Sequence, residues 1–204
     1  MKGKYIVFEG IDGSGKSTAC TNLANALVSN GYKVLLISEP SQSKIGQLLR
    51  EQMGHLEVDQ KTLALLFAAD SYNIQNDFSD NYDFILSDRN FFSTVAYQMV
   101  EVNTEWLFML HKYLKKPDII FYLNVEVNEA LERISLRDRK KEVFESKEAL
   151  YKVQKNYEKI IQNRPDYNII QIQTSQQSLG DVEKKIFNTL RSRYNISMKV
   201  GSNS

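Results

Sequence analysis

Five short apolar runs, rich in β-branched and aromatic residues, recur along the chain and predict buried strands. They cover residues 5–9, 33–38, 83–87, 119–125 and 168–173. The segments between them repeat their apolar positions about every 3.6 residues, which predicts helices. These helical segments are residues 16–30, 43–53, 60–77, 91–115, 128–137, 147–162 and 179–194. Strands that alternate with helices are typical of an α/β fold, so we expect a doubly wound five-stranded parallel sheet flanked by helices.

The composition is that of one ordinary globular domain. The chain has 204 residues, of which 42% are hydrophobic and 25% are charged. These values exclude a disulfide-stapled miniprotein and a disordered chain. We place the single domain at residues 1–197 and expect a frayed tail at residues 198–204.

Charge and cysteine content narrow the classes of partner. The 26 Lys and Arg residues nearly balance the 25 Asp and Glu residues, which leaves a net charge of +1. A balance so close to neutral argues against a dedicated nucleic-acid binder and favours small-molecule partners. No apolar run approaches the roughly 18 residues of a membrane span. We therefore expect no nucleic-acid or membrane partner. The single cysteine, Cys20, fits a reducing compartment, so we expect a cytoplasmic protein.

The strongest chemical signal lies at residues 10–17, where GIDGSGKS follows the first predicted strand and opens a helix. It matches the phosphate-binding loop G-x-x-x-x-G-K-[ST]. The glycines let backbone N–H groups surround phosphate oxygens, Lys16 brings a positive charge to the β- and γ-phosphates, and Ser17 can ligate Mg²⁺. The loop therefore predicts an ATP-type nucleotide site. Its residues are Gly10, Ile11, Asp12, Gly13, Ser14, Gly15, Lys16, Ser17 and Thr18.

A second signal lies at the end of the third predicted strand. Asp88 follows the apolar residues 84–86, where a carboxylate can hold Mg²⁺ through water, so Ser17 and Asp88 are the candidate metal ligands. Arg89 comes next, at the rim where a second phosphate can enter. A simple ion pair between Arg89 and Asp88 is the alternative, and it contributes little if exposed.

Four motifs follow one another along the chain. They are FEGIDGSGKST at 8–18, LLFAAD at 65–70, DR-x-x-x-S-x-x-A-Y-Q at 88–98, and KPD before a strand followed by NEALERI at 128–134. In this order they resemble the thymidylate kinases. The resemblance implies a P-loop kinase fold with a short lid at about 137–147, and transfer of the γ-phosphoryl group of Mg²⁺-bound ATP to dTMP, giving dTDP. It also implies a homodimer, for which the predicted helix at 91–115 is a candidate interface.

The resemblance assigns an acceptor-nucleotide site. In it, Asp12 faces the acceptor sugar, Phe67 stacks on the base, and Arg89 holds the acceptor phosphate. From the residues alone, Phe67 is equally well explained as ordinary helix core. The full implied set is Asp12, Glu39, Pro40, Phe67, Ser71, Arg89, Ser93, Thr94, Tyr97 and Gln98.

Arginines near the predicted lid complete the implied catalytic set. With glycine at position 13, the sequence fits family members whose lid supplies the arginines, here Arg137 and Arg139, beside the catalytic Lys16 and Arg89. Arg133, one helical turn earlier, matches the residue that lies over the adenine. Judged by charge alone, this basic segment is equally well a solvated helix end.

Two departures from the family pattern keep other functions open. Ser71 stands where the family commonly has an arginine that reaches the base, and the loop at 38–43 lacks an acceptor-phosphate arginine, for which Arg50 or Lys44 are candidate substitutes. One alternative is therefore a kinase for another nucleoside monophosphate or for a nucleoside. A second alternative is a catalytically impaired nucleotide-binding module. The intact charged and metal-binding residues argue against it: Lys16, Ser17, Asp88 and Arg89.

Overall fold

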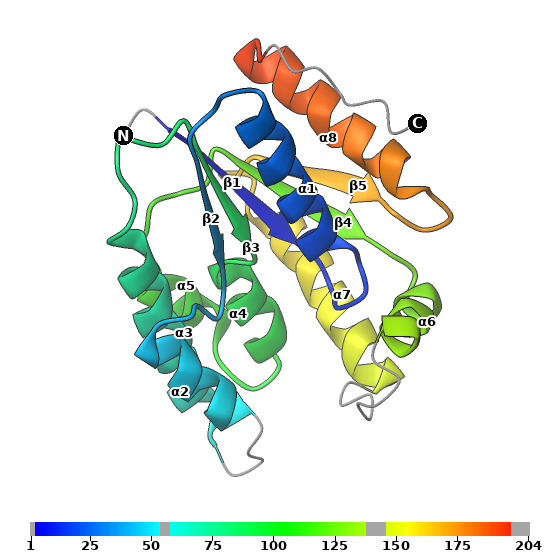
Figure 1. Ribbon diagram of the computed structural model, residues 1–204. Coiled ribbons are helices and arrows are strands. Elements are labelled where there is room, and N and C mark those ends of the chain that lie inside the picture. The colour runs from blue at the N-terminus through cyan, green and yellow to red at the C-terminus, as the bar shows by residue number, and fades with distance from the viewer. Residues whose placement is uncertain (1–2, 54–57, 138–145, 197–204) are drawn as a thin grey trace.

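The computed structural model describes residues 3–53, 58–137 and 146–196 of the chain (Figure 1). Its strands are β1 (Lys4–Glu9), β2 (Val34–Ser38), β3 (Phe84–Asp88), β4 (Ile119–Asn124) and β5 (Ile169–Gln173). The helices are α1 (Lys16–Ser29), α2 (Lys44–Met53), α3 (Gln60–Gln75), α4 (Phe91–Gln98), α5 (Thr104–Leu110), α6 (Val127–Arg137), α7 (Lys147–Asn163) and α8 (Leu179–Tyr194). The proposed tail at 198–204 lies outside the described residues. Within them, no helix has both the length and the apolar character needed to cross a membrane.

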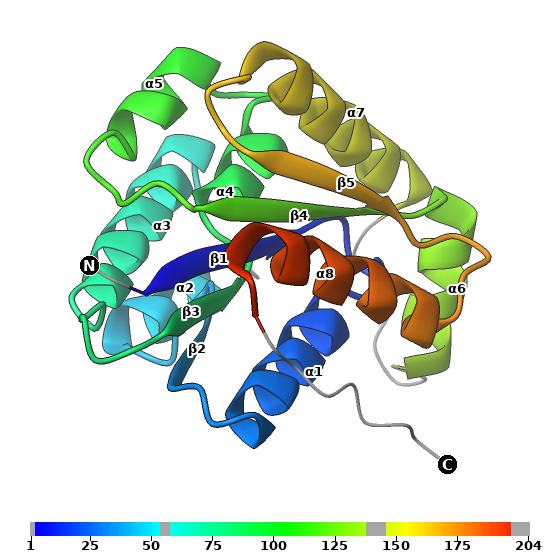
Figure 2. The same cartoon turned by 90° about the horizontal axis from the view of Figure 1, so that it is seen from above.

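The strands form one sheet in the order β2-β3-β1-β4-β5, and every neighbouring pair is parallel. Parallel strands need crossover connections, and here helices supply them on both faces. Figure 2 shows α1 and α8 on one side of the sheet, with α3, α4, α5 and α7 on the other. The predicted doubly wound five-stranded sheet is therefore confirmed.

Two hydrophobic cores lie against the two faces of the sheet. Along β1, Ile6 and Phe8 belong to the core that contains side chains of α1 and α8, whereas Tyr5 and Val7 belong to the core beneath α3, α4 and α7. Side chains alternate between the faces of a strand, so a strand covered on both sides must be apolar throughout. This burial explains why the central strands β1, β3 and β4 are nearly continuous apolar runs, whereas the edge strand β5 has the exposed Gln171 and Gln173.

The prediction of one helix over residues 91–115 is wrong, because the segment forms two helices, α4 and α5. The first ends at Gln98, and Val100 in the connection is 58% exposed. The side chain of Asn103 then accepts a hydrogen bond from the backbone N–H of Trp106 at 3.0 Å, which caps the start of α5. An N-cap in the middle of the apolar pattern thus divides the predicted helix.

The carboxyl ends of β1, β2 and β3 meet at one edge of the sheet. The chain leaves β1 for strands on one side and later returns to β4 on its other side, and ligands bind at such switch points. Asp88 at the end of β3 lies opposite both Phe8 of β1 and Ser38 of β2. The residues that follow these strands are thereby brought together.

Candidate functional site

The phosphate-binding loop joins the buried strand β1 to α1, which begins at Lys16, as the sequence predicts. Gly13 and Gly15 have φ angles of 79° and 90°, in the left-handed region that favours glycine. At Gly13, a Cβ atom would also lie 2.4 Å from the backbone oxygen of Ala130 in α6. Because α6 packs directly on the loop, position 13 leaves no room for a side chain.

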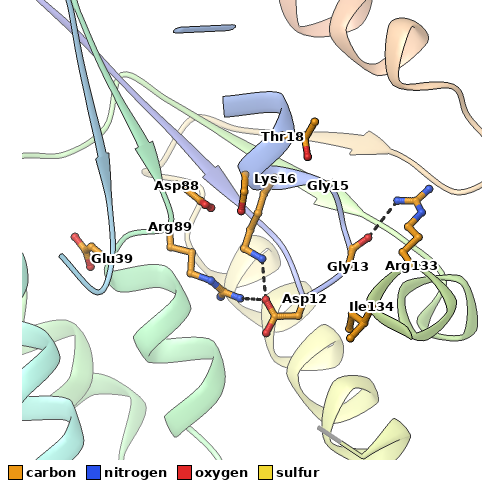
Figure 3. Close-up of a pocket in the computed structure, with 11 residues that line it drawn as sticks. Asp12, Gly13, Gly15, Lys16, Thr18, Glu39, Asp88, Arg89, Arg133 and Ile134 are labelled. Carbon is orange, nitrogen blue, oxygen red and sulfur yellow. Dashed lines mark hydrogen bonds and ion pairs between the residues drawn. The ribbon is translucent and has the colours of Figure 1, made fainter. Parts of the chain in front are cut away.

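Asp12 joins two cations at the centre of the site (Figure 3). Its Oδ1 atom lies 3.0 Å from Lys16 Nζ and 2.6 Å from Arg89 Nη2. Although burial favours the neutral form of Asp12, the charges of Arg89 and Lys16 hold the pKa of its carboxyl well below the usual range. Asp12 therefore stays ionised at neutral pH and holds both cations.

Arg89 has an unusual backbone conformation, and its guanidinium group has three hydrogen-bond partners. Its φ of 74° is left-handed, which costs of order 1 kcal/mol or more for a residue with a side chain. Its Nη1 donates to Ser93 Oγ at 2.9 Å, and its Nη2 donates to Tyr97 Oη at 3.3 Å as well as to Asp12. The ion pair is thus with Asp12 and not with Asp88, the partner considered from sequence.

A donor-side cavity of about 370 Å³ opens over the phosphate-binding loop. The loop residues Asp12, Gly13, Gly15, Lys16, Ser17 and Thr18 line it together with Glu39, Asp88, Arg89, Arg133 and Ile134. Gly10, Ile11 and Ser14 are buried behind this wall. Ser14 instead lines a neighbouring cavity of about 250 Å³, which also contacts Arg133 and Thr174.

Two oxygen donors in the donor-side cavity fit a hard divalent cation. Asp88 Oδ1 is buried and has no hydrogen-bond partner among the described residues. Ser17 is exposed and lines the same cavity. Mg²⁺ is bound by one or two protein oxygens that leave room for phosphates and water. The described residues contain no cluster of three or more His, Cys, Asp or Glu side chains that would form a closed metal site.

An acceptor-side cavity of about 390 Å³ lies between α3 and α4 and shares Asp12, Glu39 and Arg89 with the first cavity. The remaining lining residues are Pro40, Met53, Gln60, Leu63, Phe67, Asn90, Ser93, Thr94, Tyr97 and Gln98. All the acceptor residues implied by the resemblance, apart from Ser71, are therefore in this wall. Phe67 lines the cavity, so its position is not explained by packing in the helix core alone.

Three buried polar atoms of residues in this wall have no hydrogen-bond partner among the described residues: Thr94 Oγ1, Gln98 Oε1 and Asn90 Nδ2. Thr94 and Gln98 are 2% and 3% exposed. A buried polar atom left without a partner costs about 1 to 3 kcal/mol, and in a cavity wall a bound ligand or water can supply that partner. The positions of Thr94 and Gln98 beside Phe67 suit a flat ligand with polar edges.

Ser71 does not line the acceptor-side cavity. Its side chain is 1% exposed, and its hydroxyl donates a hydrogen bond to Glu39 Oε2 at 2.8 Å. The neighbouring Asp70 accepts hydrogen bonds from Ser41, both from its N–H at 2.7 Å and from its Oγ at 2.5 Å. Arg50 donates to the Pro40 carbonyl at 2.5 Å, outside the cavity wall. The end of α3 thus holds the loop after β2 in place through hydrogen bonds from outside the cavity.

Glu39 is a buried carboxyl at the junction of the two cavities. Burial, together with the nearby charges of Glu9 and Asp70, raises its pKa from 4.5 to about 8 despite the hydrogen bond from Ser71. The folded protein therefore holds this proton more tightly than the unfolded chain. The free energy of unfolding contributed by Glu39 falls as pH rises from about 4.5 to about 8.

We expect Glu39→Gln to remove this pH dependence. Because one pKa unit corresponds to 1.36 kcal/mol, the full effect is about 5 kcal/mol. Urea unfolding at about pH 4 should give nearly equal stabilities for wild type and variant, since Glu39 is then mostly protonated in both the folded and the unfolded chain. At about pH 8.5 the variant should be more stable by several kcal/mol.

Glu51→Gln is the matched control, because Glu51 is an exposed glutamate on α2. Its stability should follow the wild type at both pH values. If Glu39→Gln also follows the wild type, Glu39 is ionised in the folded protein at neutral pH and the argument from burial fails.

Arg133 reaches from α6 to the phosphate-binding loop. Its Nη1 donates to the Gly13 carbonyl at 3.2 Å, and its Nη2 donates to Glu129 at 2.6 Å and to the Thr174 carbonyl at 2.8 Å. Figure 3 shows its guanidinium beside the loop. Of the two proposed lid arginines, Arg139 lies outside the described residues, as does most of the lid, and Arg137 is the last residue of α6.

Sequence reasoning missed four residues of the acceptor-side wall: Met53, Gln60, Leu63 and Asn90. Gln60 and Leu63 precede Phe67 by seven and four positions on the same helix, so they share its face. This spacing could have identified them once Phe67 was a candidate. No comparable signal marks Met53, which comes from α2.

Comparison with known proteins agrees with this geometry. A family model described as thymidylate kinase matches residues 8–186. A probable thymidylate kinase of Methanobrevibacter smithii is 40% identical over 187 residues, 89% of this chain and 93% of that protein. One of Methanocaldococcus jannaschii is 38% identical over 193 residues, 92% and 95% of the two chains. The solved thymidylate kinase from Candida albicans shares the fold, with a TM-score of 0.79 at 21% identity over 98% of this chain and 96% of that one.

These similarities extend over both cavities and not only over the phosphate-binding loop. The matched range includes the loop, Phe67 on α3 and the residues of α4 that line the acceptor-side cavity. The archaeal relatives align with nearly the whole chain. The chain therefore belongs to the thymidylate kinase family, whose members are ATP-dependent nucleoside monophosphate kinases.

Proposed function

We propose that this protein transfers the γ-phosphoryl group of ATP to thymidylate, giving thymidine diphosphate. The observation that carries this proposal is the junction of two cavities at Asp12, Glu39 and Arg89. One cavity is built on a phosphate-binding loop, and the other has the aromatic and polar wall of a nucleotide base site. Two nucleotides placed in them would meet phosphate to phosphate.

The donor side supplies charge neutralisation. Lys16 and the loop N–H groups bind the β- and γ-phosphates, and Arg133 lies where the adenosine of ATP would extend. Ser17 and Asp88 would hold Mg²⁺, which when bound neutralises charge on the phosphate oxygens. The lid arginines Arg137 and Arg139 stay proposals from the family resemblance.

The acceptor side supplies position. Arg89 binds the acceptor phosphate, Phe67 stacks on the base, and the unpartnered Thr94 and Gln98 oxygens bind its polar edge. Tyr97, in the same wall, would lie beside the sugar. No general base is required, because a phosphate monoester dianion is already a nucleophile. Catalysis then rests on alignment of the two phosphates and on their cations.

The position of Ser71 favours one alternative, a kinase for a different nucleoside monophosphate. Its hydroxyl is directed to Glu39 and lies outside the cavity wall, so α3 offers no cation to a base carbonyl. Discrimination by a single methyl group is worth only about 1 to 3 kcal/mol. The choice of base therefore depends on Thr94, Gln98 and the fit of the ring against Phe67.

A panel of acceptors tests the proposed function. ADP release from Mg²⁺-ATP is measured with thymidylate, deoxyuridylate, uridylate, cytidylate and the purine monophosphates, with thymidine as the nucleoside control. We expect thymidylate to have the highest kcat/KM, by about tenfold over deoxyuridylate, which is what one buried methyl group provides. A preference for another monophosphate would move the assignment to a different nucleotide kinase. No stimulation by any acceptor would indicate a nucleotide-binding module.

Two further expectations stay predictions. The homodimer is expected from the family resemblance. In the segment 91–115, α4 is almost wholly buried within the chain, and the exposed apolar side chains, Val100, Met109 and Tyr113, all come after it. The cytoplasmic location is supported by the use of ATP and by Cys20, which is buried and carries no disulfide.

A further inference from the structure

A buried polar cluster lies directly beneath Arg89. Glu9, the last residue of β1, is 1% exposed and accepts three hydrogen bonds. The donors are the Asn90 N–H at 2.8 Å, Ser93 Oγ at 2.6 Å and Tyr157 Oη at 2.7 Å. Its carboxyl oxygens are therefore engaged on both sides, by groups from α4 and its N-cap and from α7.

Ser93 connects this cluster to Arg89. A serine hydroxyl has one hydrogen to donate, and here the hydrogen is directed to Glu9. The lone pairs of the same oxygen are left to accept from Arg89 Nη1 at 2.9 Å. Glu9 therefore fixes the direction in which Ser93 can receive the guanidinium group.

Tyr157 holds Glu9 from the opposite side. It is 1% exposed, its ring packs on Tyr122 with centroids 5.1 Å apart, and its hydroxyl also lies 2.9 Å from Ser93 Oγ. The preceding residue, Asn156, donates to the Ala96 carbonyl at 2.8 Å, which fastens α7 to α4. The hydroxyl of Tyr157 is thus held at a fixed place between the two helices.

Burying the carboxyl group of Glu9 costs free energy, so the cluster calls for a role beyond filling the core. Burial raises the pKa of Glu9, while the charge of Arg89 and the three donors oppose that shift. A core of apolar residues would fill the same space without such a carboxyl. Neither Glu9 nor Tyr157 lines either cavity, so a direct contact with a nucleotide does not explain them.

We propose that Glu9 and Tyr157 are positioning residues that hold Arg89, through Ser93, in the orientation in which it binds the acceptor phosphate. The proposal rests on the proposed function for the identity of that acceptor. A positioning role differs from a purely structural role because loss of either residue should weaken binding of the acceptor and leave binding of ATP unchanged.

Tyr157→Phe tests the proposal, with Tyr122→Phe as the matched control. Tyr122 is also 1% exposed, lies opposite Glu9 in the sheet, and has no hydroxyl hydrogen bond among the described residues. We expect Tyr157→Phe to raise KM for thymidylate about tenfold, the effect of one lost hydrogen bond to a charged group, with KM for ATP within about twofold of wild type. Tyr122→Phe should change neither. Equal changes in both KM values, or equal behaviour of the two variants, would overturn the proposal.

A second measurement does not depend on the acceptor. The Nε–H resonance of Arg89 in protein labelled with ¹⁵N-arginine is assigned from its loss in Arg89→Lys. It should shift or broaden in Tyr157→Phe and in the isosteric Glu9→Gln, and stay unchanged in Tyr122→Phe. An unchanged resonance in Glu9→Gln would overturn the positioning role. Absence of turnover by the wild type would instead contradict the proposed function. The resonance measurement does not require turnover, so it tests the positioning role independently.

Discussion

Replacing Lys16 by methionine is expected to lower kcat by about 10³-fold or more, because it removes the cation that we propose neutralises the transferred phosphoryl group. Lys16 is 5% exposed, and its Nζ lies 3.0 Å from Asp12 Oδ1 in the donor-side cavity. Methionine keeps the apolar stem that packs at the start of α1. The loss of charge is therefore separated from a loss of packing.

The measurement is single-turnover phosphoryl transfer with Mg²⁺-ATP and thymidylate, accompanied by thermal unfolding. Removal of a buried ammonium also removes its desolvation cost, so the variant should remain folded. Lys4→Met is the control: Lys4 lies at the opposite end of β1 and pairs with Asp118 at 3.4 Å. Its turnover should equal that of wild type. A Lys16→Met protein that retains a tenth of the wild-type rate would contradict the role given to Lys16.

The central strands β1, β3 and β4 could be predicted because burial on both faces makes each of them a short apolar run. Most helices could be predicted because their apolar positions repeat about every 3.6 residues. The five predicted strands lie within one residue of β1 to β5 at each end. The failure at 91–115 has a physical cause. The connection between α4 and α5 carries Met99, Val100 and Val102, so the apolar pattern continues where the backbone turns, and the capping by Asn103 is decided by a single side chain.

The phosphate-binding loop of the donor side was equally accessible to prediction, because its residues are consecutive in the chain. The acceptor side required the family resemblance, since α3, α4 and the loop after β2 meet only in the folded protein. The contacts behind the site could not be predicted. Tyr157 and Glu9 are separated by 148 positions, and Ser71 and Glu39 by 32, and no local pattern marks either pair.

Arg89→Ala is the second large expected effect: it should weaken thymidylate binding about 100-fold, because it removes the charge-assisted contact that we propose between Arg89 and the acceptor phosphate. Arg89 reaches the acceptor-side cavity through a guanidinium oriented by Asp12, Ser93 and Tyr97. The strained φ of 74° is imposed on alanine as on arginine, so the backbone cost should be nearly unchanged. Affinities for thymidylate and for Mg²⁺-ATP are measured separately by calorimetry.

The sharpest comparison is with Arg133→Ala, because Arg133 lies on the donor side of the junction between the two cavities. Arg133 contacts the Gly13 carbonyl and lines only the donor-side cavity and its neighbour, so its loss should weaken ATP and spare thymidylate. Arg89→Ala should do the reverse, with ATP affinity changed less than about threefold because Lys16 still holds Asp12. Opposite patterns would separate the two cavities energetically. Equal losses of both affinities in Arg89→Ala would mean that Arg89 supports the whole junction and does not bind the acceptor in particular.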